Sequence, residues 1–274
     1  MGPEHPNTLD VVHYLGFLLK DLGEWTQARV LLERALRGWG KAFGPEHPNT
    51  LSAMTNLASL LKDLREMAQA RSMYERALRG SEKALGPEHP STVSALNNFG
   101  NFLRLIGERA HARTLLERAL RLLEKTSGPE HPDTIMTVNN LGSLLCDLGE
   151  EVKARALFER ALRGWEKLLG PEHPNTLTAL SNLGALLLKL GERTQARALL
   201  ERALRGQEKV LGLEHPNTLS AMTNLALLLE VLGDRAESRA LYERALRVQE
   251  KVLGPEHPQT MKTAQAVADL RQSC

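Results

Sequence analysis

The sequence predicts an all-α fold, a right-handed solenoid of antiparallel helix pairs. Three observations predict it. A Gly-x-Glu-His-Pro block recurs every 42 residues, each interval holds two helical apolar patterns, and no insertion or deletion interrupts the series. A lone helix pair cannot bury its apolar stripe, whereas stacked pairs can, so repeats of this length form arrays in which each repeat contacts its neighbours.

The recurring block divides the chain into repeats, and we expect one repeat domain over residues 1–274 without a linker. Six repeats are complete, and a seventh segment carries only the first half of the pattern. The repeats span residues 2–43, 44–85, 86–127, 128–169, 170–211 and 212–253, and the capping helix spans residues 254–274.

Repeat five illustrates the first helix of each pair. Its leucines follow steps of three and four, typical of an apolar stripe on one helix face: Leu177, Leu180, Leu183, Leu187 and Leu190. Gly-Glu-Arg then interrupts the pattern, and a glycine there suits a turn residue with positive φ. The turn glycines are Gly23, Gly107, Gly149, Gly191 and Gly233. Repeat two has Arg65 instead, where we expect local strain.

The second helix of each pair carries both an apolar stripe and regularly spaced charges. In repeat five the stripe is Ala196, Leu199, Leu200, Ala203 and Leu204. Arg197, Glu201 and Arg205 lie four residues apart, so the carboxylate has an arginine one turn away on either side. The recurring acids and bases balance, which favours a solvated structural ladder. The alternative, a nucleic-acid-binding face, would need an excess of basic charge on one surface.

The seventh segment predicts a cap for the array. Arg271 stands where earlier first helices have Leu61, Leu145 or Leu187, and Ala266 stands where they have asparagine. A terminal helix with a more polar outer face is what a solenoid needs to remain soluble.

One histidine recurs in every block, and it has two interpretations. The seven are His5, His47, His89, His131, His173, His215 and His257. A zinc site needs several ligands at about 2.0–2.3 Å from one ion, whereas stacked helix layers lie about 8–10 Å apart. The structural interpretation explains the whole block: glycine ends one helix, the prolines start the next, and the histidine caps it. We therefore expect no metal and no cofactor.

Composition narrows the class of protein. The chain is 42% apolar and 25% charged with a formal net charge of +2, which gives no general attraction to nucleic acid or membrane. It has no apolar run long enough to span a bilayer and no signal segment at its start. Two cysteines, Cys146 and Cys274, cannot form a disulfide framework, so we expect a reducing, cytoplasmic location.

The repeats resemble the tetratricopeptide family. In repeat five the matching positions are Leu180, Leu183, Gly184, Leu187, Gly191, Ala196, Leu200 and Ala203. The usual period is 34 residues, and here the second helix and its exit loop are longer. The 42-residue period, the Asn-Asn-Leu at residues 139–141 and the Gly-Pro-Glu-His-Pro loop resemble the kinesin light chain class. The resemblance implies a tetratricopeptide superhelix whose first helices line a concave groove.

One asparagine per repeat marks the candidate binding surface. It precedes the signature leucine, and the row is Asn56, Asn98, Asn140, Asn182 and Asn224. A carboxamide both donates and accepts, so each could clamp one peptide group of an extended ligand, and the resemblance implies this use. The alternative is that each asparagine bonds to a neighbouring helix and orients the stack.

Residues beside this row change along the array. In the first repeats we expect Tyr14, Lys20, Lys62, Asn97, Asn101, Arg104 and Asn139 to contact a ligand. Asp21 and Asp63 offset part of this positive charge, and the later repeats become more apolar. An acidic peptide with a bulky apolar anchor fits such a groove, as the resemblance to kinesin light chains implies. Tyr14 and the nearby Phe17 equally fit a terminal repeat that shields its own end.

The sequence therefore predicts a non-enzymatic interaction scaffold that binds an extended or short helical peptide segment of a partner protein in its groove. It contains no nucleophile–base pair, phosphate loop or ligand cluster. We expect no nucleic-acid or membrane partner, and a monomer or weak end-to-end self-association. Two rivals remain: a structural, self-assembling repeat module, and a sensor fragment of a larger signalling protein.

Overall fold

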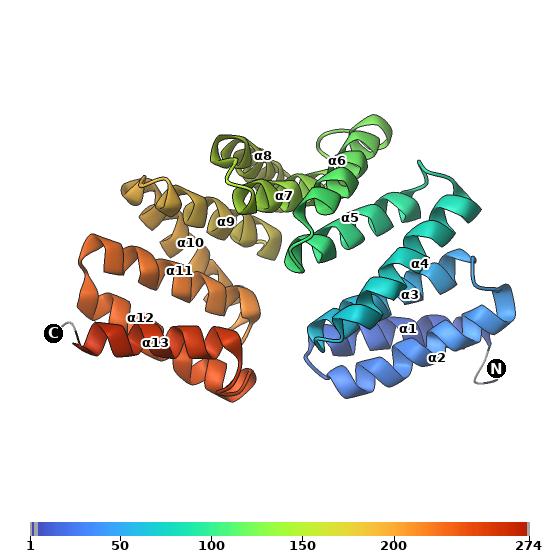
Figure 1. Ribbon diagram of the computed structural model, residues 1–274, viewed down its shortest axis with the longest axis horizontal. Helices are drawn as coiled ribbons and strands as arrows, with labels where there is room; N and C mark the ends of the chain where they lie inside the picture. Colours follow the sequence, from blue (N-terminus) through green and yellow to red (C-terminus); the bar gives the residue numbers. More distant parts are fainter. Residues whose placement is uncertain (1, 3–4, 273–274) are drawn as a thin grey trace. The chain divides into compact units, whose positions relative to one another are not determined.

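The computed structural model describes residues 2 and 5–272, and this part of the chain forms helices without strands (Figure 1). Cys274 lies outside the described residues. The helices are α1 (Pro6–Asp21), α2 (Trp25–Phe43), α3 (Pro48–Asp63), α4 (Met67–Leu85), α5 (Pro90–Leu105), α6 (Arg109–Thr126), α7 (Pro132–Asp147), α8 (Glu151–Leu169), α9 (Pro174–Lys189), α10 (Arg193–Leu211), α11 (Pro216–Leu232), α12 (Arg235–Val252) and α13 (Pro258–Gln272). The expected pair of helices is present in each of the six repeats, and α13 follows them.

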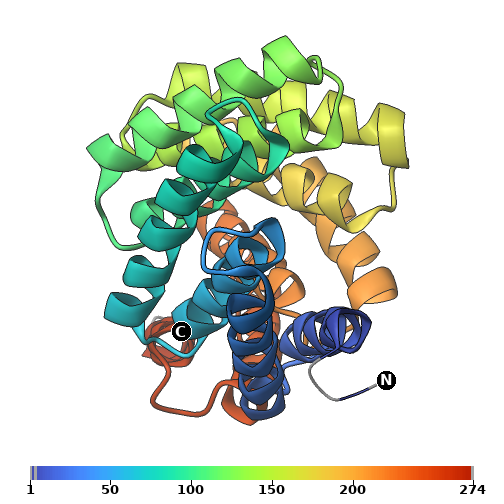
Figure 2. The ribbon, with the colours of Figure 1, turned by 90° about the vertical axis from the view of Figure 1, so that its right-hand side faces the viewer.

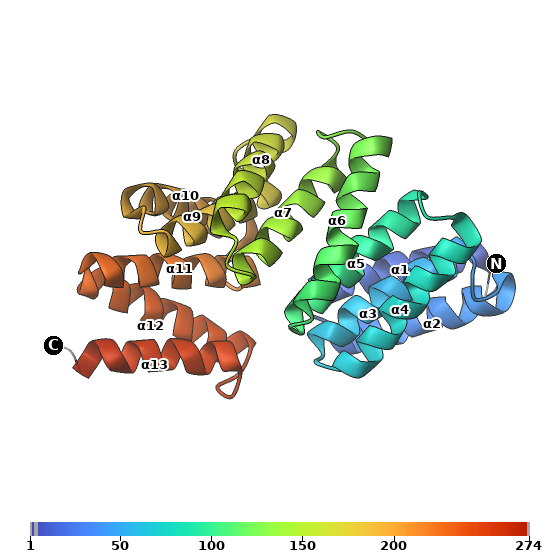
Figure 3. The ribbon, with the colours of Figure 1, turned by 45° about the horizontal axis from the view of Figure 1, so that its top comes forward.

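The helices group into two compact halves, residues 1–144 and residues 145–274, which divide within α7. In the N-terminal half each helix from α1 to α6 packs on the next one along the chain. In the C-terminal half the same holds from α8 to α13. Successive helices are antiparallel, with their connecting turns at alternate ends (Figures 1 and 3). Figure 2 views the ribbon from the side on which the blue helices α1 and α2 lie in Figure 1.

Leucines of the first helices form much of the core. Leu177, Leu180, Leu183 and Leu187 of α9 are buried, as their spacing predicts. Leu190 is exposed instead, because the helix ends at Lys189 and Leu190 caps it from outside the stripe. Leu186, which the simple stripe omits, is buried. α9 packs on both α8 and α10, and its apolar surface is therefore wider than one stripe.

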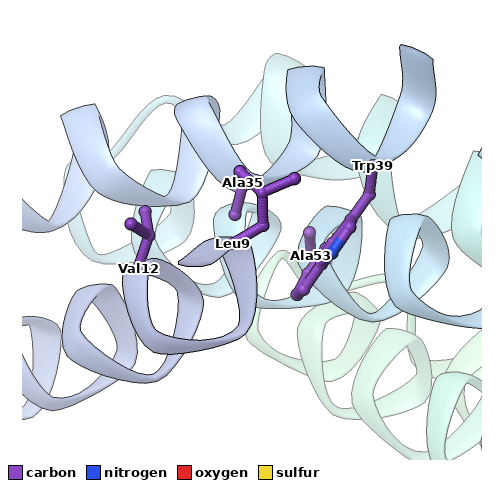
Figure 4. Packing of buried hydrophobic residues seen from close by; sticks show 5 residues of the cluster. All are labelled: Leu9, Val12, Ala35, Trp39 and Ala53. Carbon is purple, nitrogen blue, oxygen red and sulfur yellow. The ribbon is translucent and has the colours of Figure 1, made fainter. Parts of the chain in front are cut away.

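The contact between repeats one and two shows this three-helix packing. Leu9 and Val12 of α1, Ala35 and Trp39 of α2, and Ala53 of α3 form one buried cluster (Figure 4). Ala53 belongs to the next repeat, so the cluster joins two repeats. Stability of the array therefore depends on interfaces between neighbours as much as on each pair.

The turn inside each repeat has the predicted conformation. The five turn glycines have φ between 76° and 89°. Arg65 is the one non-glycine residue in the described part of the chain with positive φ, at 63°. The expected strain in repeat two is therefore present, because a side chain disfavours this region.

The recurring block ends one helix and starts the next. The block glycines after α2, α4, α8 and α10 are the C-cap residues and have φ from 81° to 90°. The C-caps of α6 and α12 lie one residue before the block glycine, at Ser127 and Leu253. In all seven blocks the histidine Nδ1 accepts a hydrogen bond from the backbone N–H two residues later, at 3.1–3.3 Å. The structural interpretation of the histidine is thus confirmed as a helix N-cap.

Threonine in the first helical turn has a separate role from the histidine cap. The threonine hydroxyl donates back to the carbonyl of the block glycine, as Thr92 does to Gly86 at 2.8 Å. The histidine already accepts from the N–H of the next-but-one residue, which leaves threonine to close the loop. Equivalent bonds are made by Thr8, Thr50, Thr134 and Thr176.

The charge ladder has contacts within helices and between repeats. Arg197 Nε lies 2.8 Å from Glu201, and Arg205 lies 3.7 Å from the same carboxylate. The arginine at this position also pairs with an acid of the next repeat, the residue directly before its second helix, which we call the turn acid. Arg29 pairs with the turn acid Glu66 at 2.6 Å. Equivalent pairs are Arg71–Glu108, Arg155–Glu192 and Arg197–Asp234. These partly exposed pairs fix the register between neighbours more than they stabilise the fold.

The last helix carries the expected polar outer position. Arg271 is exposed and pairs with Glu243 of α12 at 2.8 Å. No helix in the described part of the chain is both long enough and apolar enough to cross a membrane.

Candidate functional site

First helices of neighbouring repeats lie side by side. α3 contacts α1 and α5 in the N-terminal half, and α9 contacts α11 in the C-terminal half. The candidate residues stand on this row of first helices, at positions that recur every 42 residues. We call the row of positions equivalent to Ser52, Thr55, Asn56, Ser59 and Lys62 the first-helix surface.

The recurring asparagine is half-buried in every repeat. Asn56 and Asn140 bond to the preceding repeat. Asn56 Nδ2 lies 2.8 Å from the His13 Nε2, and Asn140 Nδ2 donates to Asn97 Oδ1 at 3.1 Å. Asn97 is itself buried, so its carboxamide serves Asn140 within the stack. These two bonds are the helix-orienting role that the sequence left open as an alternative.

The other asparagines differ in their surroundings. Asn139 and Asn182 both interact with neighbouring groups. The side chains of Asn98 and Asn224 make no hydrogen bond with any part of the chain between residues 5 and 272, and both residues are half-buried. A half-buried carboxamide without a protein partner keeps its full capacity to donate and accept. Asn98 and Asn224 therefore have the most hydrogen-bonding capacity to offer a ligand.

Positive charge on the N-terminal half is partly neutralised. Lys62 lies 3.0 Å and Lys20 lies 3.6 Å from Asp63, which confirms the expected offset by this acid. Arg104 Nε donates to Asn101 Oδ1 at 3.3 Å. The side chain of Asp21 lies outside the described part of the structure. Asp63 therefore offsets part of the charge of the two lysines.

Aromatic residues of the first repeat have divergent environments. Tyr14 and Phe17 are exposed, and the Lys20 ammonium lies 5.9 Å from the Phe17 ring centroid. His13, the residue before Tyr14, is buried with its ring edge against Trp39 and the ring centroids 5.0 Å apart. Burial lowers the pKa of His13, although the charge of Asp10 partly opposes this effect. His13 is therefore a neutral partner for Asn56 near pH 7.

A pocket of about 640 Å³ lies between α11 and α13 in the C-terminal half. On α11 it is lined by Ser220, Thr223, Asn224, Leu227 and Glu230, the five positions of the first-helix surface in repeat six. The rest of the lining comes from α12 and α13: Tyr242, Gln259, Lys262, Thr263, Gln265, Ala266 and Asp269. The face of α11 that the repeat pattern identifies therefore lines this pocket.

The pocket offers donors and acceptors of several kinds. Its hydroxyl, amide, ammonium and carboxylate groups could bind backbone and polar side chains. Burial, helped by the charge of Glu230, raises the pKa of Tyr242 to about 12. Tyr242 therefore keeps its proton and can donate a hydrogen bond.

Sequence reasoning missed the contribution of α13 to this pocket. We treated α13 as a cap, because it lacks the recurring asparagine and carries Arg271 outward. Lys262 and Asp269 recur in no other repeat at their positions, and this departure from the repeat pattern was the available signal. Among residues 2 and 5–272, no three His, Cys, Asp or Glu side chains gather closely enough to hold a metal ion.

Comparison with known proteins identifies the repeats. A family model described as tetratricopeptide repeat matches residues 7–83, 52–125, 92–151, 133–209 and 178–234, and a second one of the same description matches residues 218–259. No curated protein sequence matches the chain.

Solved structures with the same fold include kinesin light chain-like proteins. The nearly identical repeats of a Podosopora anserina kinesin light chain are 28% identical, with 75% of this chain and 98% of that chain covered and a TM-score of 0.59. BtubC (BKLC) from P. vanneervenii is 19% identical over 88% of this chain and 94% of its own, with a TM-score of 0.62. A Rap protein complexed with competence and sporulation factor is 13% identical, with coverage of 96% and 74% and a TM-score of 0.64. The last two show the fold alone. The chain therefore belongs to the tetratricopeptide repeat family, and its repeats are of the kinesin light chain-like class.

Proposed function

We propose that this chain is a non-enzymatic scaffold that binds an extended or short helical peptide of a partner protein along its first-helix surface. Tetratricopeptide repeats generally serve protein–protein interaction, which supports the broad class. One observation carries the finer proposal: the pocket between α11 and α13 is lined by the five positions that the repeat register assigns to the ligand face. A peptide is a suitable ligand, because the lining offers scattered donors and acceptors rather than one charged centre.

Asn98 and Asn224 are the two residues of the row that we assign to main-chain clamping. The side-chain carboxamide of neither residue hydrogen-bonds to another part of the described chain. Asn56 and Asn140 instead hold neighbouring repeats in register through His13 and Asn97. Asn182, Asn101 and Asn139 flank the same surface and would make secondary contacts.

An acidic segment with a bulky apolar anchor is the ligand chemistry that we assign to the N-terminal half. Lys20, Lys62 and Arg104 bring three cations to this half, and Asp63 offsets part of the charge of the two lysines. Tyr14 and Phe17 supply exposed aromatic surface close to these cations. Steering by these charges would appear mainly in the association rate and its dependence on salt.

A peptide-display screen tests the proposal. The wild-type chain should enrich acidic sequences with one large apolar residue, and an Asn98→Ala/Asn224→Ala variant should fail to enrich them. An Asn56→Ala variant is the matched control, because this carboxamide is already used inside the protein. Enrichment of the same sequences by the wild type and the Asn98→Ala/Asn224→Ala variant would refute the assigned surface.

A further inference from the structure

Helix α1 exposes an apolar face that the first-helix surface does not include. Val11, Leu15 and Leu18 are all exposed, and we call them the α1 outer face. Leu15 is 45% exposed and Leu18 is 54% exposed. Steps of three and four place these side chains along one side of the helix. A contiguous apolar patch of this kind marks an interaction site.

The positions of Leu15 and Leu18 are buried in every later repeat. Residues equivalent to Leu15 are Leu57, Phe99, Leu141, Leu183, Leu225 and Val267, and none is more than 6% exposed. Residues equivalent to Leu18 are Leu60, Phe102, Leu144, Leu186, Leu228 and Leu270, and none is more than 4% exposed. The α1 outer face is therefore an interior surface of this fold, left uncovered in the described part of the chain.

Second helices show what covers this surface. Tyr74 of α4 stacks on Phe99 and Phe102 of α5, with ring centroids 6.1 Å and 5.2 Å apart. In the same way Tyr242 of α12 packs with Val267 and Leu270 of α13. In both cases the covering element is a second helix that brings one bulky apolar side chain over this pair of positions.

Charge at the adjacent turn points to the same occupant. The covering second helix also supplies an arginine to the turn acid, as Arg29 does for Glu66 at 2.6 Å. Glu24 is the turn acid of repeat one, and its contact in the described structure is Gln27 of its own helix, at 3.3 Å. The exposed carboxylate of Glu24 therefore lies next to the α1 outer face. In a later repeat the equivalent carboxylate, Glu66, pairs with Arg29 of the preceding second helix.

We propose that the α1 outer face docks an amphipathic helix of a partner protein built on the pattern of this chain's own second helices. The pattern is an arginine, then a Leu, Tyr or Phe three residues later, an alanine six residues later and a leucine seven residues later. The chain supplies six examples: Arg29-Leu32-Ala35-Leu36, Arg71-Tyr74-Ala77-Leu78, Arg113-Leu116-Ala119-Leu120, Arg155-Phe158-Ala161-Leu162, Arg197-Leu200-Ala203-Leu204 and Arg239-Tyr242-Ala245-Leu246. The apolar residues cover Leu15 and Leu18, and the arginine pairs with Glu24.

A second copy of this chain is a poorer occupant. Its last described helix, α13, is a first helix, so head-to-tail stacking would place two first helices against each other without a second helix between them. The apolar stripes of its second helices are already buried within the chain, as Ala196, Leu200 and Ala203 are in α10. A copy therefore offers no uncovered helix of the required pattern.

A labelled peptide with the sequence of α8, residues Glu151–Leu169, is a direct probe. α8 packs on α9, whose Leu183 and Leu186 match Leu15 and Leu18 in residue type as well as position. A side-chain cross-link on the solvent-facing side would keep the peptide helical before it binds. Fluorescence anisotropy with the full chain should show saturable binding, and no saturation up to about 1 mM peptide would overturn the proposal.

Matched variants locate the binding. Leu15→Gln/Leu18→Gln changes exposed side chains, so folding should persist by circular dichroism while affinity falls about tenfold or more. Glu24→Arg should weaken binding about threefold, and the peptide with Arg155→Glu should recover it. Asn98→Ala/Asn224→Ala should leave this affinity unchanged, which separates the site from the first-helix surface.

Two outcomes would overturn the proposal even if the peptide binds. Equal affinity for the wild type and for Leu15→Gln/Leu18→Gln would show that the peptide binds to α9 by displacing α8, and not to the α1 outer face. Concentration-dependent dimerisation in sedimentation experiments, abolished by the same two substitutions, would make a second copy the occupant.

Discussion

At the turn between α3 and α4, Arg65 adopts a φ of 63° where the other repeats have glycine. A side chain in this region costs about 1 kcal/mol or more, and glycine relieves it at a smaller entropic cost. Arg65→Gly should therefore raise the free energy of unfolding by about 0.5–1 kcal/mol, measured as a higher urea midpoint. Gly107→Arg, the reverse change in the next repeat, should lower the midpoint, and a gain of stability there would contradict this account.

His13 should make stability depend on pH. Burial holds the pKa of His13 below its ordinary value, so below about pH 6.5, where an exposed histidine takes up a proton, the unfolded chain binds a proton that the folded chain excludes. The contribution of His13 is present above that pH and is lost as pH falls towards the lowered pKa. His13→Asn should reduce the loss of stability between about pH 7 and pH 5 in thermal unfolding.

Asparagine is the right comparison for His13. The pair Asn97–Asn140 shows that an asparagine at this position bonds to the recurring asparagine of the next repeat. The capping histidines are common to both proteins, so their protonation cancels in the difference. Identical pH profiles for the wild type and His13→Asn would mean that burial does not hold His13 neutral.

At the scale of helices, glycines two residues apart in α2 have opposite roles. A Cβ at Gly38 would lie 2.6 Å from Leu9 Cδ1, whereas a Cβ at Gly40 would approach nothing closer than 4.0 Å. Gly38→Ala should therefore destabilise by about 1–3 kcal/mol through overpacking against buried Leu9. Gly40→Ala should stabilise by about 0.5–1 kcal/mol through helix propensity. Thermal unfolding of the two variants measures the contrast, and equal shifts would contradict the close packing of α1 on α2.

Helix pairs, turns and caps were predictable because each depends on residues close in the sequence. The turn glycine, the block histidine and the Arg197–Glu201 spacing all act within a few residues. The pairs Arg29–Glu66 and Asn56–His13 join residues 37 and 43 positions apart, and only the stacking geometry brings them together. The burial of His13 depends on the same stacking geometry.

The site was partly predictable for the same reason. The repeat register identified the face of α11 that lines the pocket, including Asn224 and Glu230. It did not identify Lys262 and Asp269, because α13 departs from the repeat pattern. Exposure of Leu15 and Leu18 was equally hidden, since their sequence matches that of buried residues in other repeats.

At the scale of the molecule, the repeats present different surfaces for different purposes. Contacts between neighbours carry stability, and the first-helix surface varies from repeat to repeat around a constant framework. A ligand that contacts several first helices gains affinity from many modest interactions. Such binding depends on the residues that the framework does not use, notably Asn98 and Asn224.

The most direct test of this account is a paired measurement on the Asn98→Ala/Asn224→Ala variant. The peptide with the highest affinity from the display screen is titrated against the wild type and the variant, and the unfolding midpoint of each protein is recorded. We predict a dissociation constant about tenfold weaker, as loss of two hydrogen bonds implies, with an unchanged midpoint. An unchanged dissociation constant, or a midpoint that falls with the affinity, would contradict the claim that these asparagines serve a ligand rather than the fold.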